Sequence, residues 1–264
     1  MEAYKTAGLF SIKFQMAKSL ENAVETKNIL SDYKIVQQIG YGSKANEYSA
    51  FDRQTNEIVC IKVLQKENQL EAKKTKTHWK KEFRLLRMFK SPFIMKYYTS
   101  FETSNSNILV LELCQLGSLD SLITRMKSEE TLHITEKQIV DWMIQILLAL
   151  SLLKNSKIIH RNIKPANIFL TYDLSVMLGD FGSSIDVSKT NEKSHHKAGN
   201  MQYKSPEMCL CSIESKQNEY DYKTDIWSLG ISLYELCSLK LPYYGKSEEK
   251  MLQKINNIII ERIP

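Results

Sequence analysis

Two glycines, a lysine and a glutamate in the first third of the chain have residue types and spacing that could bind phosphate groups. Gly40 and Gly42 flank Tyr41 in a turn between two predicted strands, where bare glycine backbone can approach phosphate oxygens with its N–H groups. Lys62 lies on a later predicted strand and Glu82 on the helix that follows, so an ion pair between them could aim the ammonium group at phosphates. Each signal alone is weak, because glycine is common in hairpins and single charged residues usually lie on the surface.

Three blocks in the second half of the chain carry a far more specific signal. They are HRNIKPANIFL at residues 160–170, GDFG at residues 179–182 and SPE at residues 205–207. In this order and at this spacing they resemble the protein kinase family, and the resemblance extends from Tyr33 to the end of the chain. The NIFL ending, the YKSPE block and the run TDIWSLG, YELC and KLPYYG further resemble the NIMA-related (Nek) Ser/Thr kinases.

The resemblance implies an ATP and Mg2+ site made of particular side chains. Lys62 would contact the α and β phosphates and be held by Glu82, while Lys164 would meet the γ phosphate. Asn167 and Asp180 would bind Mg2+, because hard oxygen ligands suit a hard cation that bridges phosphate oxygens.

The resemblance also places the adenine ring, which would lie between two lobes. Leu111 would be the gatekeeper, and the backbone from Glu112 to Cys114 would be the hydrogen-bonding edge. Cys60 would form part of the roof and Phe169 would lie beneath the ring. Suitable residue types also occupy the internal stack of side chains that the fold requires, namely Leu86, Tyr97, His160 and Phe181, anchored by Asp225.

The most consequential departure from the family is Asn162, which stands where kinases have the catalytic Asp. A carboxylate accepts the proton of the substrate hydroxyl and orients it, whereas a neutral carboxamide can hydrogen-bond but is no base near neutral pH. Loss of a general base typically costs about 10² to 10⁴ in rate. We therefore expect residual activity at most.

Two departures near the phosphate loop predict weakened or altered nucleotide binding. Ala45 replaces the third glycine of the loop, and Glu47 stands where the family has an apolar residue above adenine. A carboxylate packed there is costly unless it turns to water or finds a cation. Lys62 on the adjacent strand is one such cation, and this pair would compete with Glu82.

The activation segment departs from the family as well. The Gly-Thr step that braces the substrate site is Gly199 and Asn200 here, so the hydroxyl is missing. The phosphorylated Thr of Nek relatives falls near His196 in an ungapped alignment. Arg161 then lacks its phosphate partner, unless Ser194 substitutes.

The spacing of hydrophobic residues changes near Gly117 from a pattern typical of strands to one typical of helices. Before it, the pattern predicts strands at residues 33–40, 45–51, 57–64, 94–101 and 107–113, with one helix at residues 71–90. After it, Thr135 and Gln138 form a capping-box signature that opens a helix through residues 142–153, and residues 224–239 predict another buried helix.

The predicted fold is therefore α+β, a bilobal protein-kinase fold with a small antiparallel-sheet N-lobe and a mostly helical C-lobe. We assign residues 1–32 to a helical N-terminal extension, 33–112 to the N-lobe, 113–117 to the hinge and 118–264 to the C-lobe. The C-lobe is expected to be truncated, because kinases continue for two or more helices after the segment that ends at Pro264. Those helices normally supply an arginine to Glu207, and loss of one partner of a buried pair costs about 3 to 5 kcal/mol.

The composition excludes several classes of protein. The 264 residues are 43% hydrophobic and 25% charged with only 9 Gly and 5 Pro, which excludes collagen-like, low-complexity and wholly disordered chains. The net charge of +6 does not demand nucleic acid, and the basic run at residues 73–84 predicts a solvated helix face. Five cysteines without a C-x-x-C pair suit a reducing compartment, and the longest apolar stretch is short of the roughly 18 residues that span lipid.

Three hypotheses about function follow. The leading one is a Nek-like pseudokinase in the cytoplasm that holds ATP and Mg2+ weakly and acts as a scaffold for protein partners. The resemblance suggests a microtubule-based assembly such as a centrosome, basal body or cilium, with residues 1–32 and the truncated lobe as docking surfaces. A slow but active Ser/Thr kinase is the alternative, since most of the ATP-site residues are present. An engineered inactive kinase is disfavoured, because one designed substitution would not explain Ala45, Glu47 and Asn200.

Overall fold

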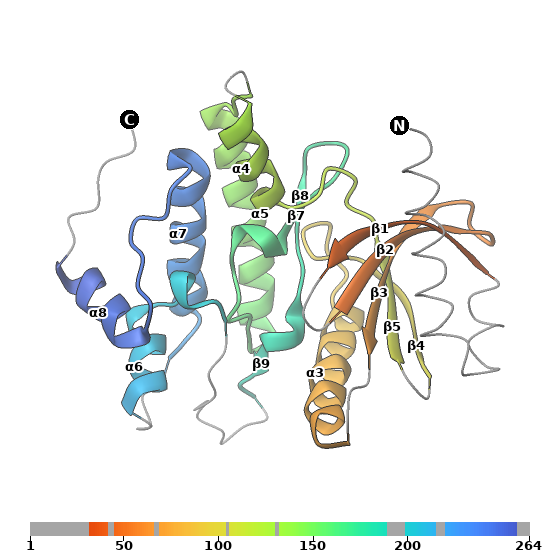
Figure 1. Ribbon diagram of the computed structural model, residues 1–264, viewed down its shortest axis with the longest axis horizontal. Coiled ribbons are helices and arrows are strands. Elements are labelled where there is room, and N and C mark those ends of the chain that lie inside the picture. Colours follow the sequence, from red (N-terminus) through yellow and green to blue (C-terminus); the bar gives the residue numbers. More distant parts are fainter. Residues whose placement is uncertain are drawn as a thin grey trace. The chain divides into compact units, whose positions relative to one another are not determined.

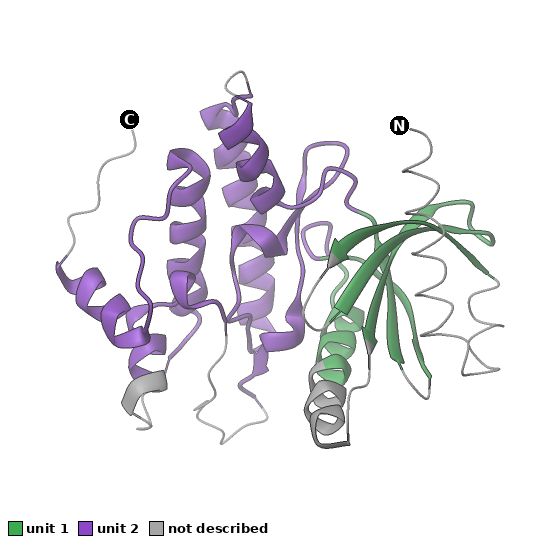
Figure 2. Ribbon diagram, in the orientation of Figure 1, with its two compact units in different colours: residues 1–90, 95–113 green, residues 91–94, 114–264 purple. Residues whose placement is uncertain are grey.

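The computed structural model describes residues 32–41, 45–65, 69–103, 106–129, 132–188, 199–214 and 220–257 (Figure 1). The predicted helical extension at residues 1–32 lies outside them except for Asp32, as do Gly42, Ser194 and His196. The chain forms two compact units, which are residues 1–90 with 95–113 (unit 1) and residues 91–94 with 114–264 (unit 2) (Figure 2).

Unit 1 contains an antiparallel sheet of five strands in the order β1-β2-β3-β5-β4 (Figure 1). Its strands are β1 (Tyr33–Tyr41), β2 (Ala45–Asp52), β3 (Ile58–Gln65), β4 (Tyr97–Glu102) and β5 (Ser106–Glu112). Side chains along β3 alternate between the two faces of the sheet, so Val59, Ile61 and Val63 are buried on one face while Ile58 is 54% exposed on the other. These buried side chains belong to one apolar cluster with residues of β2 and β5.

A long helix, α3 (Gln69–Met88), accompanies this sheet in unit 1. Trp79 and Phe83 are four residues apart and stack with their ring centroids at 5.8 Å, and Phe83 meets Tyr97 of β4 edge to face at 5.4 Å. Leu85 and Leu86 near its end are buried, whereas Lys80 and Arg84 are exposed, which agrees with the predicted basic face at these two positions. Lys81 is half-buried, and the side chains of residues 73–78 lie outside those that are described. Packing of this aromatic face fixes the helix that carries Glu82.

Unit 2 is mostly helical, which confirms the predicted α+β class. Its helices are α4 (Leu119–Ser128), α5 (Glu136–Asn155), α6 (Pro206–Glu214), α7 (Lys223–Ser238) and α8 (Glu248–Asn257). Short strands pair as β6 (Ile158–Ile159) with β9 (Ile185–Asp186) and β7 (Ile168–Leu170) with β8 (Val176–Leu178). Single 3-10 turns lie at η1 (Pro165–Asn167), η2 (Phe181–Ser183) and η3 (Met201–Tyr203).

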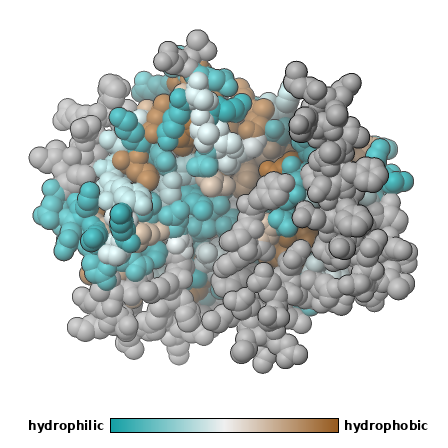
Figure 3. All heavy atoms as spheres, in the orientation of Figure 1, coloured by the Kyte–Doolittle hydropathy of each residue, from teal (hydrophilic) through white to brown (hydrophobic). Residues whose placement is uncertain are grey.

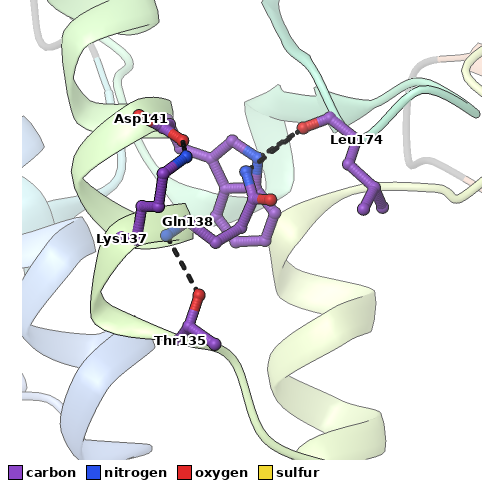
Figure 4. A network of polar contacts seen from close by, with 6 residues as sticks. Thr135, Lys137, Gln138, Asp141 and Leu174 are labelled. Carbon is purple, nitrogen blue, oxygen red and sulfur yellow. Dashed lines mark hydrogen bonds and ion pairs between the residues drawn. The ribbon is translucent and has the colours of Figure 1, made fainter.

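Helix α5 begins where the sequence predicts and is tied to the β7–β8 turn. The Thr135 side chain accepts a hydrogen bond from the Gln138 N–H at 3.2 Å, which caps the helix (Figure 4). One turn later, Trp142 Nε1 donates to the carbonyl of Leu174 at 2.8 Å (Figure 4). The helix is thereby anchored beside the strands that carry the site in this unit.

Of the helices among the described residues, none could cross a lipid bilayer. On the face shown in Figure 3, hydrophobic residues lie in separate groups among hydrophilic ones. Among the residues that the structure describes, no helix is both long and apolar enough to span a membrane.

Candidate functional site

Unit 1 contains the predicted ion pair between a strand lysine and a helix glutamate. Lys62 Nζ lies 2.8 Å from Glu82 Oε1, and the Glu82 side chain is almost fully buried. A carboxylate that deep requires a charged partner, because an isolated buried charge is costly. The pair therefore holds the Lys62 ammonium in one place, as a phosphate-binding lysine requires.

Of the alternatives that the sequence left open for Glu47, a pair with Lys62 is not present in the structure. In the β-ladder Glu47 of β2 lies opposite both Lys62 of β3 and Gly40 of β1, yet Lys62 bonds to Glu82. The Glu47 side chain lies against Gly40, where an added Cβ would come within 3.0 Å of Glu47 Oε2. Among the described residues Glu47 forms no ion pair. Gly40 thus leaves the space that this carboxylate occupies.

The residues predicted to surround adenine are found in both units, and their roles stay predictions. In unit 1, Cys60 is half-buried on β3 opposite Leu111 of β5, and Glu112 ends the same strand. In unit 2, Cys114 is buried and Phe169 is half-buried on β7.

The loop between β6 and β7 in unit 2 is held by one buried carboxylate. Asp225 of α7 accepts the N–H of His160 on Oδ2 and the N–H of Arg161 on Oδ1, both at 2.8 Å. Arg161 has a positive φ of 68°, a conformation that costs a non-glycine residue about 1 to 3 kcal/mol and needs such support. Burial raises the pKa of Asp225 to about 6, while the two backbone N–H groups act in the opposite direction. The carboxylate is ionised at neutral pH.

His160 and Phe181 fix the segment that carries Asp180. Burial lowers the pKa of His160 to about 4, so its imidazole is neutral at pH 7. Its Nδ1 accepts the N–H of Asn162 at 3.3 Å, which leaves Nε2 to donate to the carbonyl of Gly179 at 3.1 Å. The Phe181 ring, fully buried, meets the imidazole edge to face at 4.9 Å.

Three polar side chains converge beside this stack. Asn162 Nδ2 donates to Asp180 Oδ2 at 2.8 Å, and Asn167 Nδ2 donates to the backbone carbonyl of Asn162 at 2.7 Å. The Gly179 N–H also bonds to the carbonyl of Asn167 at 3.0 Å, which ties the two segments together. Because the Asn167 amide nitrogen is used in this way, its oxygen is the group left for a cation.

The donor set of Asn167 and Asp180 fits Mg2+. Two protein oxygens are what a magnesium ion needs when phosphate oxygens and water complete its octahedral shell. Among the described residues no cluster of three or more His, Cys, Asp or Glu side chains could hold a metal ion without such additional ligands. These residues would hold the ion through the Asp180 carboxylate and the Asn167 amide oxygen.

Lys164 and Glu207 lie in unit 2 without charged partners in the part of the chain that is described. The half-buried Lys164 precedes η1 and forms no ion pair there, so its ammonium is available to an anion. Glu207 is half-buried at the start of α6 and likewise forms no ion pair among these residues.

The guanidinium group of Arg161 has neutral oxygen partners that sequence reasoning missed. Its Nε donates to the carbonyl of Ser183 at 2.7 Å and its Nη1 to the hydroxyl of Tyr220 at 2.9 Å. Tyr220 lies 59 residues further along the chain, and no sequence signal links the two. These two hydrogen bonds fix the guanidinium group with no negative charge in either acceptor.

Gly199 and Asn200 are both used locally. Gly199 has a φ of 76°, and an added Cβ would come within 2.3 Å of the Arg161 carbonyl oxygen, so only glycine fits. The Asn200 side chain accepts the N–H of Gln202 at 3.1 Å and caps η3. Position 200 therefore has a side chain that caps η3, and it lacks the hydroxyl group that braces the loop in the family.

The two units and their side chains define a protein kinase domain. The family model of that domain matches residues 33–263, and the chain belongs to this family. It is 34% identical over 227 residues to the Ser/Thr-protein kinase Nek5 of Homo sapiens, which is 86% of this chain and 30% of that protein. It is 33% identical over 226 residues to Nek1 of Mus musculus, which is 86% of this chain and 18% of that protein. It is 32% identical over 235 residues to Nek3 of Mus musculus, which is 89% of this chain and 43% of that protein. The chain spans less than half the length of these relatives.

Proposed function

We propose that this protein is a Nek-like pseudokinase, which binds nucleotide and acts by binding other proteins rather than by efficient phosphoryl transfer. The observation that carries the proposal is the hydrogen bond from the Asn162 carboxamide to Asp180 at 2.8 Å. In an active kinase the residue at this position accepts the proton of the substrate hydroxyl. Here the side chain is neutral, and its nitrogen is committed to Asp180.

The chemistry of the amide explains the expected loss of rate. The Asn162 oxygen can still accept a hydrogen bond from a hydroxyl group, but it cannot take the proton near neutral pH. Losing a general base costs about 10² to 10⁴ in rate, or about 3 to 5.5 kcal/mol of barrier. The rest of phosphoryl transfer depends on positioning and electrostatics, so some residual turnover is expected.

Nucleotide binding is supported within each unit. Unit 1 contains Lys62 held by Glu82, and unit 2 contains Lys164, Asn167 and Asp180. Protein kinase domains in general use ATP and Mg2+, and these residue types suit phosphates and a hard cation. Glu47 supports the proposal that nucleotide affinity is weakened, since its carboxylate lies beside Gly40 of the phosphate loop.

The test of impaired catalysis is a direct rate measurement with the purified protein, ATP, Mg2+ and casein as a generic substrate. Kinases typically turn over at about 1 to 100 per second, and we expect a rate at least about 10²-fold lower. An Asp180→Ala variant is the control, because transfer that survives it comes from a contaminating kinase. A rate within the ordinary range that Asp180→Ala abolishes would refute the proposal.

A slow but active Ser/Thr kinase is the second candidate. It is favoured by the intact ion pair of Lys62 and Glu82 and by the free ammonium of Lys164 in the described structure. This candidate predicts that labelled phosphate accumulates on serine and threonine over hours in proportion to protein concentration, whereas a purely structural protein would transfer none.

The proposed setting is a microtubule-based assembly such as a centrosome, basal body or cilium. Similarity to the Nek kinases supports this proposal. We expect the fluorescently tagged protein, expressed in ciliated cells of its source, to concentrate at such structures and to co-sediment with microtubule-associated proteins. A uniform distribution unchanged by microtubule depolymerisation would contradict this part of the proposal and leave the catalytic part standing.

A further inference from the structure

Asn162 lowers the negative charge beside Asp180, a residue of the predicted metal site, and donates a hydrogen bond to it. An aspartate at position 162 would place a second carboxylate beside Asp180. The chain instead has one carboxylate and one amide whose N–H points at Oδ2 of that carboxylate, at 2.8 Å. One negative charge is absent, and the other is partly neutralised by a hydrogen-bond donor.

Both partners of this hydrogen bond are fixed by their backbones. The N–H of Asn162 bonds to His160 Nδ1, and its carbonyl accepts Asn167 Nδ2. Asp180 has a left-handed φ of 60°, and the preceding Gly179 is bonded to Asn167 through its N–H and to His160 through its carbonyl. The backbone of the loop therefore holds the two residues close enough for this contact.

This arrangement changes what a divalent cation contributes to nucleotide binding. In a site with two carboxylates the phosphates are strongly repelled, and Mg2+ removes that repulsion by binding between the negative groups. In this site the amide N–H already offsets part of the Asp180 charge, and residue 162 carries no negative charge that would repel the phosphates. Compared with a site of two carboxylates, this site repels the phosphates less when no ion is bound. It also attracts the ion less, because it has one negative charge fewer.

We propose that Asn162 makes nucleotide binding by this protein nearly independent of Mg2+, because its amide takes over the charge-screening role of the cation at Asp180. The proposal rests on the proposed nucleotide binding and adds the form of the ligand, which is a nucleoside triphosphate that binds with or without Mg2+.

The test compares ATP dissociation constants by isothermal titration calorimetry with excess Mg2+ and with EDTA. For the unaltered protein we expect the two constants to agree within about threefold. For Asn162→Asp we expect binding in EDTA to be at least about tenfold weaker than in Mg2+. Asn155→Asp is the matched control, since it adds the same charge at an exposed position at the end of α5 in unit 2 and should behave like the unaltered protein.

A tenfold or greater requirement for Mg2+ in the unaltered protein would overturn the proposal, as would an unchanged ratio in Asn162→Asp. If ATP binds in neither buffer, both this proposal and the proposed nucleotide binding are wrong. The proposal of impaired catalysis is tested separately by the transfer rate, and a slow rate leaves it standing. Brisk transfer with metal-independent binding would refute only the catalytic proposal.

A second measurement keeps the inference testable if Asn162→Asp fails to fold. In protein labelled with 15N at asparagine, the Asn162 side-chain amide is assigned by its loss in Asn162→Ser. We expect the hydrogen that it donates to Asp180 to exchange more slowly with water than its other hydrogen, and both signals to stay in place when Mg2+ is added without nucleotide. Equally rapid exchange of both hydrogens, or a shift that saturates at sub-millimolar Mg2+, would show that the amide does not screen Asp180.

Discussion

Replacing Asn162 by Asp is expected to raise the rate of phosphoryl transfer by about 10² or more. The substitution restores a carboxylate where the reaction needs a proton acceptor, and the two side chains have nearly the same volume. The backbone at position 162 is held by His160 and Asn167 through main-chain atoms, so it keeps its place, while the new carboxylate loses the hydrogen bond to Asp180 and turns away from that side chain. The gain should be in kcat, because a general base acts in the transition state.

The measurement is kcat and KM for ATP at saturating Mg2+, with casein as the acceptor. Asn162→Gln is the control, because it keeps the amide chemistry and should gain nothing. No gain in Asn162→Asp would mean that a second feature also blocks the reaction. The candidates are Glu47, whose carboxylate lies at the phosphate loop, and Asn200, which caps η3 in place of bracing the loop.

The order of the chemical motifs made much of this fold predictable. Glycines, a strand lysine, a helix glutamate and the blocks around His160 and Asp180 occur in one sequence order that few folds share. Strand alternation in unit 1 then placed the sheet within a few residues, and the sequence indicated Lys62 and Glu82 as one possible ion pair, which the structure contains. In unit 2 the Thr135 cap marked the start of a helix because its signal is local.

The parts that sequence reasoning missed depend on contacts between distant residues or on side-chain direction. The strands of unit 2 from Ile158–Ile159 to Ile185–Asp186 are two or three residues long, too short for a period to register. Which carboxylate Lys62 would choose was open, because β2 and α3 both present one. Nor could the sequence show that the Asn162 amide points at Asp180, since that direction is set by the folded loop.

Replacing Asp225 by Ala is expected to destabilise the protein by about 3 to 5 kcal/mol. The carboxylate is 3% exposed and accepts two backbone N–H groups, those of His160 and Arg161. Alanine would leave both donors buried without acceptors, at about 1 to 3 kcal/mol each. It would also release Arg161, whose φ of 68° is unfavourable without support.

Two further variants separate this role from a general effect of removing a carboxylate. Asp225→Asn keeps one acceptor oxygen but turns an N–H toward a backbone N–H, so its loss should lie between zero and that of Asp225→Ala. Asp221→Ala is the matched control, because Asp221 also accepts a backbone N–H, from Lys223 at 2.8 Å, yet is exposed. We expect its loss to be about 1 kcal/mol or less.

The free energy of unfolding of each variant is measured by urea denaturation, and amide exchange reports the loop directly. In the unaltered protein the N–H groups of His160 and Arg161 should be among the slowest to exchange, because both are buried and bonded to a fixed carboxylate. Asp225→Ala should speed their exchange far more than that of amides in α5. A contradicting result would be that Asp225→Ala lowers the free energy of unfolding no more than Asp221→Ala and leaves the amides of His160 and Arg161 protected. In that case contacts other than the Asp225 carboxylate hold the loop that carries Asn162.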